Sequence, residues 1–159
     1  MNTTQFNTVV EDYADNLYRF VLGIVRIRAV AEDVVQESFS RVWENRRKVE
    51  PAKSKSYLFT IAYNLAISEL RARNRRQSED FSLTQLATQG SYNNLTEMIW
   101  QTLDTMSETQ RSVIMLCDWE GYSYHEITQI MGLSLAQVKI YIHRTRNLLK
   151  ERLQDEYRD

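Results

Sequence analysis

The stretch "GYSYHEITQIMGLSLAQVKIYIHRTRNLL", residues 121–149, contains two amphipathic segments separated by a very short turn. A Ser followed three residues later by Glu or Gln, the sequence signature of a capping box, opens each segment, at Ser123 and at Ser134. Gly132 stands between the segments, where a left-handed backbone conformation ends a helix. The pattern predicts a helix–turn–helix with helices over 123–131 and 135–154.

The second of these helices has two chemically distinct faces when residues are placed at about 100° per residue. We expect one face to pack against the domain, and it carries Leu135, Val138, Ile142, Thr145 and Leu149. The other face and its flanks, with the capping serine, carry Ser134, Ala136, Gln137, Lys139, Ile140, Tyr141, His143, Arg144 and Asn147. A capped helix start binds phosphate, Gln suits adenine, Arg suits guanine or phosphate, and Ile suits a thymine methyl group. The sequence therefore predicts a helix that reads duplex DNA in the major groove.

The composition favours an all-α protein without an active site. The 159 residues are 43% hydrophobic and 26% charged, with four glycines and one proline, too few for a turn-rich β fold. Cys117, the single cysteine, excludes an internal disulfide, and it shares no metal-ligand spacing with His125 or His143. The sequence contains no order of residues typical of a catalytic triad and no glycine-rich phosphate loop. We therefore expect no enzyme activity, no metal and no cofactor.

The net charge of −1 hides a strong segregation of charge along the chain. Residues 41–76 hold ten Lys or Arg against three Asp or Glu, and residues 139–152 hold five against one. Residues 77–126 between them hold one against eight. Two basic segments separated by an acidic one predict two places of contact with a polyanion.

The rest of the chain is predicted to form further helices. Apolar residues at three- and four-residue steps predict helices over 4–26, 29–45 and 54–73. A third capping box, Ser107 with Gln110, predicts a helix over 107–119, and a weaker cap, Asn94 with Glu97, predicts one over 94–105. A charged loop containing Pro51 follows the helix over 29–45, and the periodicity fails from Asn74 to Asn93, a polar stretch with room for one turn near Phe81 to Leu86. We expect two small helical domains, 1–76 and 94–159, joined by a flexible linker, 77–93. No apolar run is long enough to span a membrane and no targeting segment precedes the first helix, so we expect a cytoplasmic protein.

Aromatic residues lie among the cations of the first basic segment. Tyr57, Phe59 and Tyr63 stand between the basic loop after residue 45 and the arginines near residue 73. Rings that stack on unpaired bases, together with cations that bind phosphate, are typical of single-strand binding sites. Phe59 is expected in the core, and Tyr63 is the better candidate for an exposed ring.

Three segments in the same order resemble bacterial RNA polymerase sigma factors of the extracytoplasmic-function (ECF) type. They are "AEDVVQESFSRVWENR" (31–46), "SYLFTIAYNLAISELRAR" (56–73) and "SETQRSVIMLCDWEGYSYHEITQIMGLSLAQVKIYIHRTRNLLKERL" (107–153). The resemblance implies two helical domains, called domains 2 and 4, that bind core RNA polymerase and promoter DNA. It leaves room for an anti-sigma factor as a further partner, and it implies no small-molecule substrate.

The resemblance also implies where each partner binds. The surface facing the clamp helices of the polymerase β′ subunit would comprise Asp33, Gln36, Glu37, Ser40 and Arg41. The loop from Asn45 to Lys55 and the following helix would bind the single-stranded minus-ten element through Arg46, Arg47, Lys48, Lys53, Lys55, Tyr63, Asn64, Arg71 and Arg73. The helix–turn–helix would read the minus-thirty-five element and rest on the β-subunit flap.

Two other functions remain compatible with the residues. A helix–turn–helix regulator that binds duplex DNA without acting as a sigma factor explains residues 121–149 but gives no role to the aromatic and basic front segment. A helical adaptor or sequestering protein would use its acidic faces to bind a partner. In-vitro transcription with core polymerase distinguishes the three.

Overall fold

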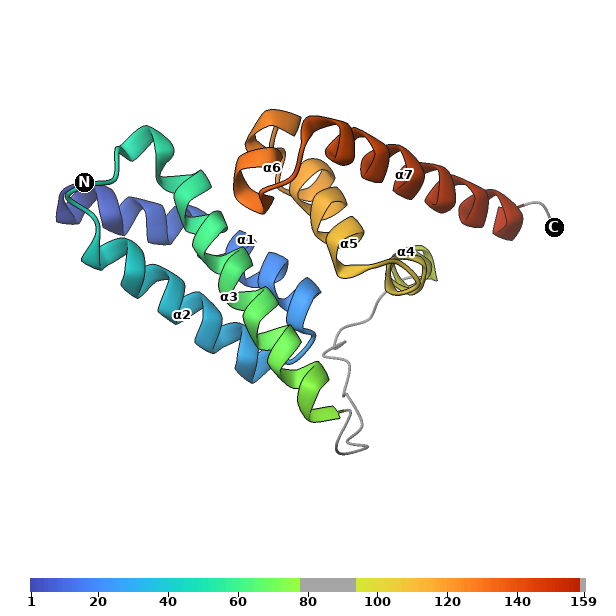
Figure 1. The fold of residues 1–159 in the computed structure, drawn as a ribbon, viewed down its shortest axis with the longest axis horizontal. Coiled ribbons are helices and arrows are strands. Elements are labelled where there is room, and N and C mark those ends of the chain that lie inside the picture. The colour runs from blue at the N-terminus through green and yellow to red at the C-terminus, as the bar shows by residue number, and fades with distance from the viewer. Residues whose placement is uncertain (78–93, 158–159) are drawn as a thin grey trace. The chain divides into compact units, whose positions relative to one another are not determined.

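The computed structural model describes residues 1–77 and 94–157, and within these ranges every regular element is a helix. The chain divides into two compact units, Met1–Thr88 and Gln89–Asp159. The predicted turn near Phe81 to Leu86 lies outside the described residues. The all-α fold in two helical units agrees with the sequence prediction (Figure 1).

The first unit is a three-helix bundle in which each helix contacts the other two. Its helices are α1 (Thr3–Val25), α2 (Arg28–Glu44) and α3 (Ser54–Gln77), with a short 3₁₀ turn, η1 (Pro51–Lys53), before α3. A capping box between Asn2 and Gln5 opens α1, and Arg26 ends it in the left-handed region at φ 63°. The reversal at Arg26 brings α2 directly back against α1.

The core of this unit is formed where the three helices face one another. Phe20 of α1 and Phe59 of α3 lie with ring centroids 5.5 Å apart. The surrounding buried residues are Leu17, Val21, Ile24, Ala31, Val34, Val42, Leu58 and Ala62. Because α3 contacts both neighbours, it buries a face wider than a single apolar stripe.

Helix α3 continues beyond the point at which the periodicity fails. We expected it to end at Arg73 and the polar stretch to begin at Asn74, but the helix runs to Gln77. Residues 74–77 are polar but include neither Gly nor Pro, and Arg and Gln are good helix formers. The guanidinium of Arg73 also donates a hydrogen bond to the carbonyl of Val25, which fastens this end of α3 to the end of α1.

The second unit contains the predicted helix–turn–helix. Its elements are α4 (Asn94–Asp104), α5 (Glu108–Ile114), a five-residue π-helical turn η2 (Met115–Trp119), α6 (Tyr124–Met131) and α7 (Leu135–Tyr157). Helix α7 contacts α4, α5 and α6, so it forms the spine of the unit. Leu103, Ile114, Leu116, Ile127, Ile130, Val138, Ile142 and Thr145 are buried around it.

All three predicted capping boxes of the second unit are present. At Ser107, Ser123 and Ser134 the serine hydroxyl accepts a hydrogen bond from the amide three residues later, and that residue's side chain accepts one from the serine amide. Gly132 adopts the predicted left-handed conformation at φ 68°. The turn between α6 and α7 is therefore fixed at both sides, which determines how the start of α7 is presented.

Candidate nucleic-acid interface

The start of α7 presents its outward residues to solvent as the helical periodicity predicts. Ala136, Lys139, His143 and Arg144 are exposed, and Ile140 exposes 46% of its surface. Tyr141 is half-buried on the flank, and Asn147 lies within 3.1 Å of the His143 ring. A cationic face with an apolar residue at its centre can bind phosphates and approach a thymine methyl group.

The inward face of α7 differs from the prediction at one position. Val138, Ile142 and Thr145 are buried, but Leu135 is 47% exposed. A helical side chain covers the turn that precedes its own Cα atom, and the first residue of a helix has no such turn beneath it. Leu135 therefore adds a second apolar side chain to the exposed start of α7.

Gln137 takes part in the capping box, which restricts how it can contact a base. Its Oε1 atom accepts a hydrogen bond from the Ser134 amide at 2.9 Å, and its own amide donates to Ser134 Oγ at 3.1 Å. Bidentate recognition of adenine needs both the oxygen and the nitrogen of the side-chain amide. Because Oε1 has a second lone pair, Gln137 can still donate from Nε2 and accept at Oε1 while the box stays closed, but the bond to Ser134 fixes the direction in which its amide faces.

Arg146 faces the body of the second unit and not the outward face of α7. Its guanidinium bonds the Asp118 carboxylate twice, at 2.6 and 3.4 Å, and approaches Cys117 Sγ at 3.6 Å. The hydrogen bond to Asp118 raises the pKa of Arg146. Burial and then the charge of Asp118 raise the pKa of the Cys117 thiol. The pair links α7 to η2 and leaves Lys139 and Arg144 as the outward cations near the helix start.

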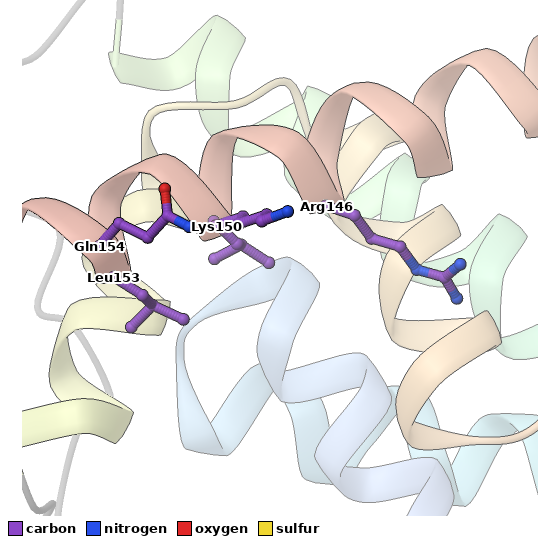
Figure 2. A pocket seen from close by; sticks show the side chains of 5 residues that line it. Arg146, Lys150, Leu153 and Gln154 are labelled. Carbon is purple, nitrogen blue, oxygen red and sulfur yellow. The ribbon is translucent and has the colours of Figure 1, made fainter.

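Farther along α7 an open groove of about 400 Å³ is lined by Arg146, Leu149, Lys150, Leu153 and Gln154. Figure 2 shows Lys150, Leu153 and Gln154 together on one stretch of α7, with Arg146 extending away from them. The leucines form an apolar floor between polar side chains. Such a shallow surface is suited to a protein contact and not to enclosing a small molecule.

In the first unit, the five residues expected to face the polymerase clamp lie together on the outer side of α2. Asp33, Gln36, Glu37, Ser40 and Arg41 are all exposed. Arg41 Nε pairs with Glu37 Oε1 at 3.0 Å across one helical turn. The intervening Ser38 points inward, where its hydroxyl donates to the Val34 carbonyl. The outer side of α2 is thus a polar, accessible surface of the kind that a protein partner contacts.

The cations of the loop between α2 and α3 have different environments. Arg47 and Lys48 are exposed. Lys53 lies 3.7 Å from Glu50, and Lys55 lies 5.5 Å from the centre of the Tyr13 ring. Arg46 is half-buried over the ring of Trp43. The loop therefore presents Arg47, Lys48 and Lys53 to solvent, while Arg46 and Lys55 lie against aromatic rings.

Two residues expected to contact the minus-ten strand are turned inward, contrary to the sequence prediction. Tyr63 is only 8% exposed, because the wide buried face of α3 includes it together with Phe59. Arg73 is half-buried and bonds the Val25 carbonyl, and burial lowers the pKa of its guanidinium. Asn64 and Arg71 are exposed as expected. Of the three rings considered for base stacking, Tyr57 is the most accessible, although it too is half-buried.

Comparison with known proteins gives the same two-part division. The family model for sigma-70 region 2 matches residues 9–76, and that for sigma-70 region 4 matches residues 96–149. The ECF RNA polymerase sigma factor SigL of Mycobacterium tuberculosis is 31% identical over 155 residues, which cover 91% of this chain and 86% of the relative. The chain belongs to the ECF RNA polymerase sigma factors. Sigma factors bind core RNA polymerase and direct it to promoter DNA.

Other sigma factors of this family are similarly related. SigE of Mycolicibacterium smegmatis is 29% identical over 157 residues, and the match spans 93% of this chain but 61% of that protein. SigM of Bacillus subtilis is 28% identical, with 89% and 91% covered. The structure of the sigma factor RpoE from Bartonella quintana, solved with the anti-sigma factor NepR, superposes with a TM-score of 0.81 at 27% identity, covering 94% of this chain and 96% of that one.

The described residues of this sigma factor contain neither a metal-binding cluster nor a membrane-spanning helix. No group of three or more His, Cys, Asp or Glu side chains in residues 1–77 and 94–157 could hold a metal ion. None of the described helices has the length and apolar character needed to cross a membrane. Two of the contacts that sequence analysis missed are long-range: the Asp118–Arg146 pair joins residues 28 apart, and the Arg73–Val25 bond joins residues 48 apart.

Proposed function

We propose that this sigma factor binds the promoter with two separate surfaces and core polymerase with a third. The first unit would bind the polymerase clamp and the minus-ten element, and the second would bind the minus-thirty-five element. The observation that carries the proposal is the segregation of exposed cations between the loop after α2 and the start of α7. One cationic surface could serve a regulator of duplex DNA, but two in separate units fit a factor that contacts a promoter at two places.

The start of α7 is the proposed reader of the minus-thirty-five element. The contacts with base edges would come from Gln137, Ile140 and Arg144, and those with phosphate from Lys139 and His143. Ser134, Ala136 and Tyr141 would border the contact. The closed capping box leaves amides at the helix start oriented for phosphate, which fixes the register of the helix on the duplex.

The loop between α2 and α3 is the proposed site of the minus-ten single strand. Arg47 and Lys48 would hold phosphates, and Asn64 and Arg71 on the exposed side of α3 would extend the contact along the strand. A base leaves the stack at a cost of a few kcal/mol, which such contacts could offset. Tyr63 and Arg73 are not included, because their side chains are turned inward.

The outer side of α2 is the proposed contact with the β′ clamp helices. Its residues Asp33, Gln36, Glu37, Ser40 and Arg41 combine both signs of charge within about two helical turns, which favours a specific orientation over general affinity.

We further propose that the apolar groove of α7 supports a contact with the polymerase β flap. An anti-sigma factor would regulate the chain, and the chain would act in the cytoplasm, where transcription takes place. The chemistry of RNA synthesis would belong entirely to the polymerase.

The test is in-vitro transcription with purified core polymerase and this chain as the sole specificity factor. The template would be a library of promoter fragments, and the transcripts would be sequenced. We expect transcripts to start at a limited set of sites that share two conserved elements. Specific DNA binding by the free chain without any transcripts from core polymerase would instead identify a regulator that is not a sigma factor.

A further inference from the structure

The beginning of the loop between α2 and α3 is held by a stack of three side chains. The guanidinium carbon of Arg46 lies 3.8 Å from the centre of the Trp43 ring, and Arg46 Nη1 donates to the Trp43 carbonyl at 2.8 Å. Phe6 of α1 meets the same indole edge-on, with centroids 4.9 Å apart and planes at 62°. Phe6 also packs against Phe39 at 6.5 Å. Trp43 therefore contacts both a cation and a second aromatic ring.

Met1 and helix α1 also contact the loop and the residues next to it at other points. The amino nitrogen of Met1 donates to the carbonyls of Arg46 and Val49 at 2.5 and 3.2 Å. Val49 is 9% exposed, so the middle of the loop is anchored by a buried side chain. The Lys55 ammonium at the far end approaches the ring of Tyr13. Met1 thus holds the loop backbone at Arg46 and Val49, and Tyr13 of α1 contacts Lys55 just beyond the loop.

Arg46 and its neighbours Arg47 and Lys48 have opposite environments, although all three are cations of one short segment. Arg46 uses its planar group to cover Trp43, whereas Arg47 and Lys48 extend into solvent. A guanidinium that leaves the Trp43 ring to reach a phosphate would forfeit both the stacking contact and the bond to the Trp43 carbonyl. The geometry therefore favours different roles for adjacent cations.

We propose that Phe6, Trp43 and Arg46 are positioning residues for strand opening. They fix the loop so that Arg47 and Lys48 meet the DNA strand, and Arg46 itself stays on Trp43 in the open complex. This inference rests on the proposed role of the loop in binding the minus-ten element. Fixing the loop in advance removes the entropy cost of ordering it when a base is captured.

Substitution of an arginine by Lys distinguishes an arginine that positions the loop from one that contacts phosphate. Lys keeps the charge of Arg but lacks the planar group that stacks on a ring and bonds a carbonyl at the same time. At Arg47, a Lys should therefore restore most of the opening that Arg47→Ala removes. At Arg46, a Lys should restore little, and Arg46→Lys should resemble Arg46→Ala.

The experiment measures permanganate reactivity of promoter thymines in the complex of the full chain with core polymerase. We expect Phe6→Ala, Arg46→Ala and Arg46→Lys each to lower reactivity by about fivefold, the change in population that one cation–π contact controls. Phe6→Tyr, which keeps the ring, should restore reactivity. The double variant Phe6→Ala/Arg46→Ala should lose no more than either single variant, because both act through Trp43.

Hydrogen exchange of the free full-length chain provides an independent readout that needs neither polymerase nor DNA. We expect the amides of residues 45–53 to exchange faster in Phe6→Ala and Arg46→Lys, and at the wild-type rate in Arg47→Ala and in Arg19→Lys, a surface control on α1. Unchanged exchange across α1 and α3 would establish that the variants are folded. Equal exchange of the loop in wild type and Arg46→Lys would overturn the proposal.

The outcomes distinguish this inference from the function on which it depends. Wild-type opening by Arg46→Lys, together with a defect in Arg46→Ala, would make Arg46 a phosphate contact and refute the positioning role alone. Full opening by a chain whose residues 46–50 are replaced by Gly and Ser would refute the role of the loop in melting, whatever the behaviour of Arg46→Lys. Full opening by Phe6→Ala would also overturn the inference.

Discussion

The two proposed DNA-contacting regions differ in what holds their side chains in place. On α7 the outward residues belong to one regular helix, whose start is closed by a capping box between residues three apart. In the loop after α2 the backbone is held by Met1, and the Trp43 ring beside the loop is held by Phe6 of α1, both from more than 35 positions away in the sequence. The surface on α7 is fixed by residues that are close in sequence, whereas the loop after α2 is fixed by the assembled bundle.

This difference has consequences for how substitutions combine. Side chains on the outer face of a stable helix act nearly independently, because removing one leaves the backbone beneath the others unchanged. Loop residues that share one aromatic anchor are coupled, so the loss of the anchor affects every contact that the loop makes. Substitutions in the loop should therefore cost more function than substitutions on α7, and their effects should not be the sum of independent contact losses.

The largest expected effect is the loss of strand opening when residues 46–53 are replaced by Gly and Ser. The replacement removes Val49, η1 and the cations together, so nothing offsets the few kcal/mol needed to extrude a base. We expect permanganate reactivity of promoter thymines to fall by about a hundredfold, the change that a few kcal/mol produces. Footprints over the upstream element should remain. Simultaneous loss of the upstream footprint would show that the two surfaces are not independent and would break the comparison.

The next effect concerns base discrimination by α7. Arg144→Ala should weaken binding to the preferred upstream sequence by about 1–3 kcal/mol relative to a variant sequence, as a lost base contact does. Lys150→Ala, at the far end of the same helix, should change affinity by a similar small factor for both sequences. The measurement is competition between promoter variants with the holoenzyme. Unchanged preference in Arg144→Ala would contradict the proposed docking of this helix.

Gln137 allows a sharper test, because the capping role and the base-contacting role can be separated. Gln137→Glu keeps a side-chain oxygen for the Ser134 amide but removes the amide donor, whereas Gln137→Ala removes both. We expect both variants to alter base preference, but only Gln137→Ala to destabilise the second unit, by about 1 kcal/mol. Thermal unfolding of each variant measures the change in stability, and promoter competition measures the change in base preference. If Gln137→Glu kept the wild-type base preference, the role of Gln137 would be limited to capping the helix.

The smallest expected effect is chemical and does not involve DNA. Burial and the Asp118 carboxylate both raise the pKa of the Cys117 thiol, so at a given pH less of it is the reactive thiolate than in an ordinary cysteine. Asp118→Asn removes the second cause, so the inflection in the rate of alkylation should move to lower pH, while burial keeps it raised. Iodoacetamide labelling followed by mass spectrometry from pH 7 to 10 measures it. A shift of the inflection to higher pH would show that the charge of Asp118 is not what raises the pKa of the Cys117 thiol.

Sequence reasoning succeeded for most of the structure that is determined by residues within about one helical turn. The helix–turn–helix, Gly132 and the capping boxes follow from spacings of three and four residues, and the outward face of α7 follows from the same periodicity. The roles assigned to individual site residues remain predictions. The same kind of local signal, Asn2 followed by Gln5, would have identified the capping box of α1.

It failed where a residue's environment depends on more than one neighbouring helix. Tyr63 was expected to be exposed because a single apolar stripe on α3 excludes it, but α3 packs against two helices and buries a wider face. Arg73 and Arg46 were counted as DNA-binding cations, which remains a prediction. The Val25 partner of Arg73 is 48 residues away, and although Trp43 is three residues from Arg46, the Phe6 ring that packs on Trp43 comes from another helix. Composition identifies a cation but not the group that it faces.

The π-helical turn at Met115–Trp119 affects how this domain can tolerate insertions and deletions. Its bond from the Glu120 amide to the Met115 carbonyl closes over five residues and not four, so the turn holds one residue more than an α-helical turn would. We expect homologous chains that are one residue shorter at this point to continue as a regular α-helix and still place their helix–turn–helix correctly. A one-residue change in length, which would rotate everything downstream of an ordinary helix by about 100°, can be absorbed here without disturbing the part of the domain that reads DNA.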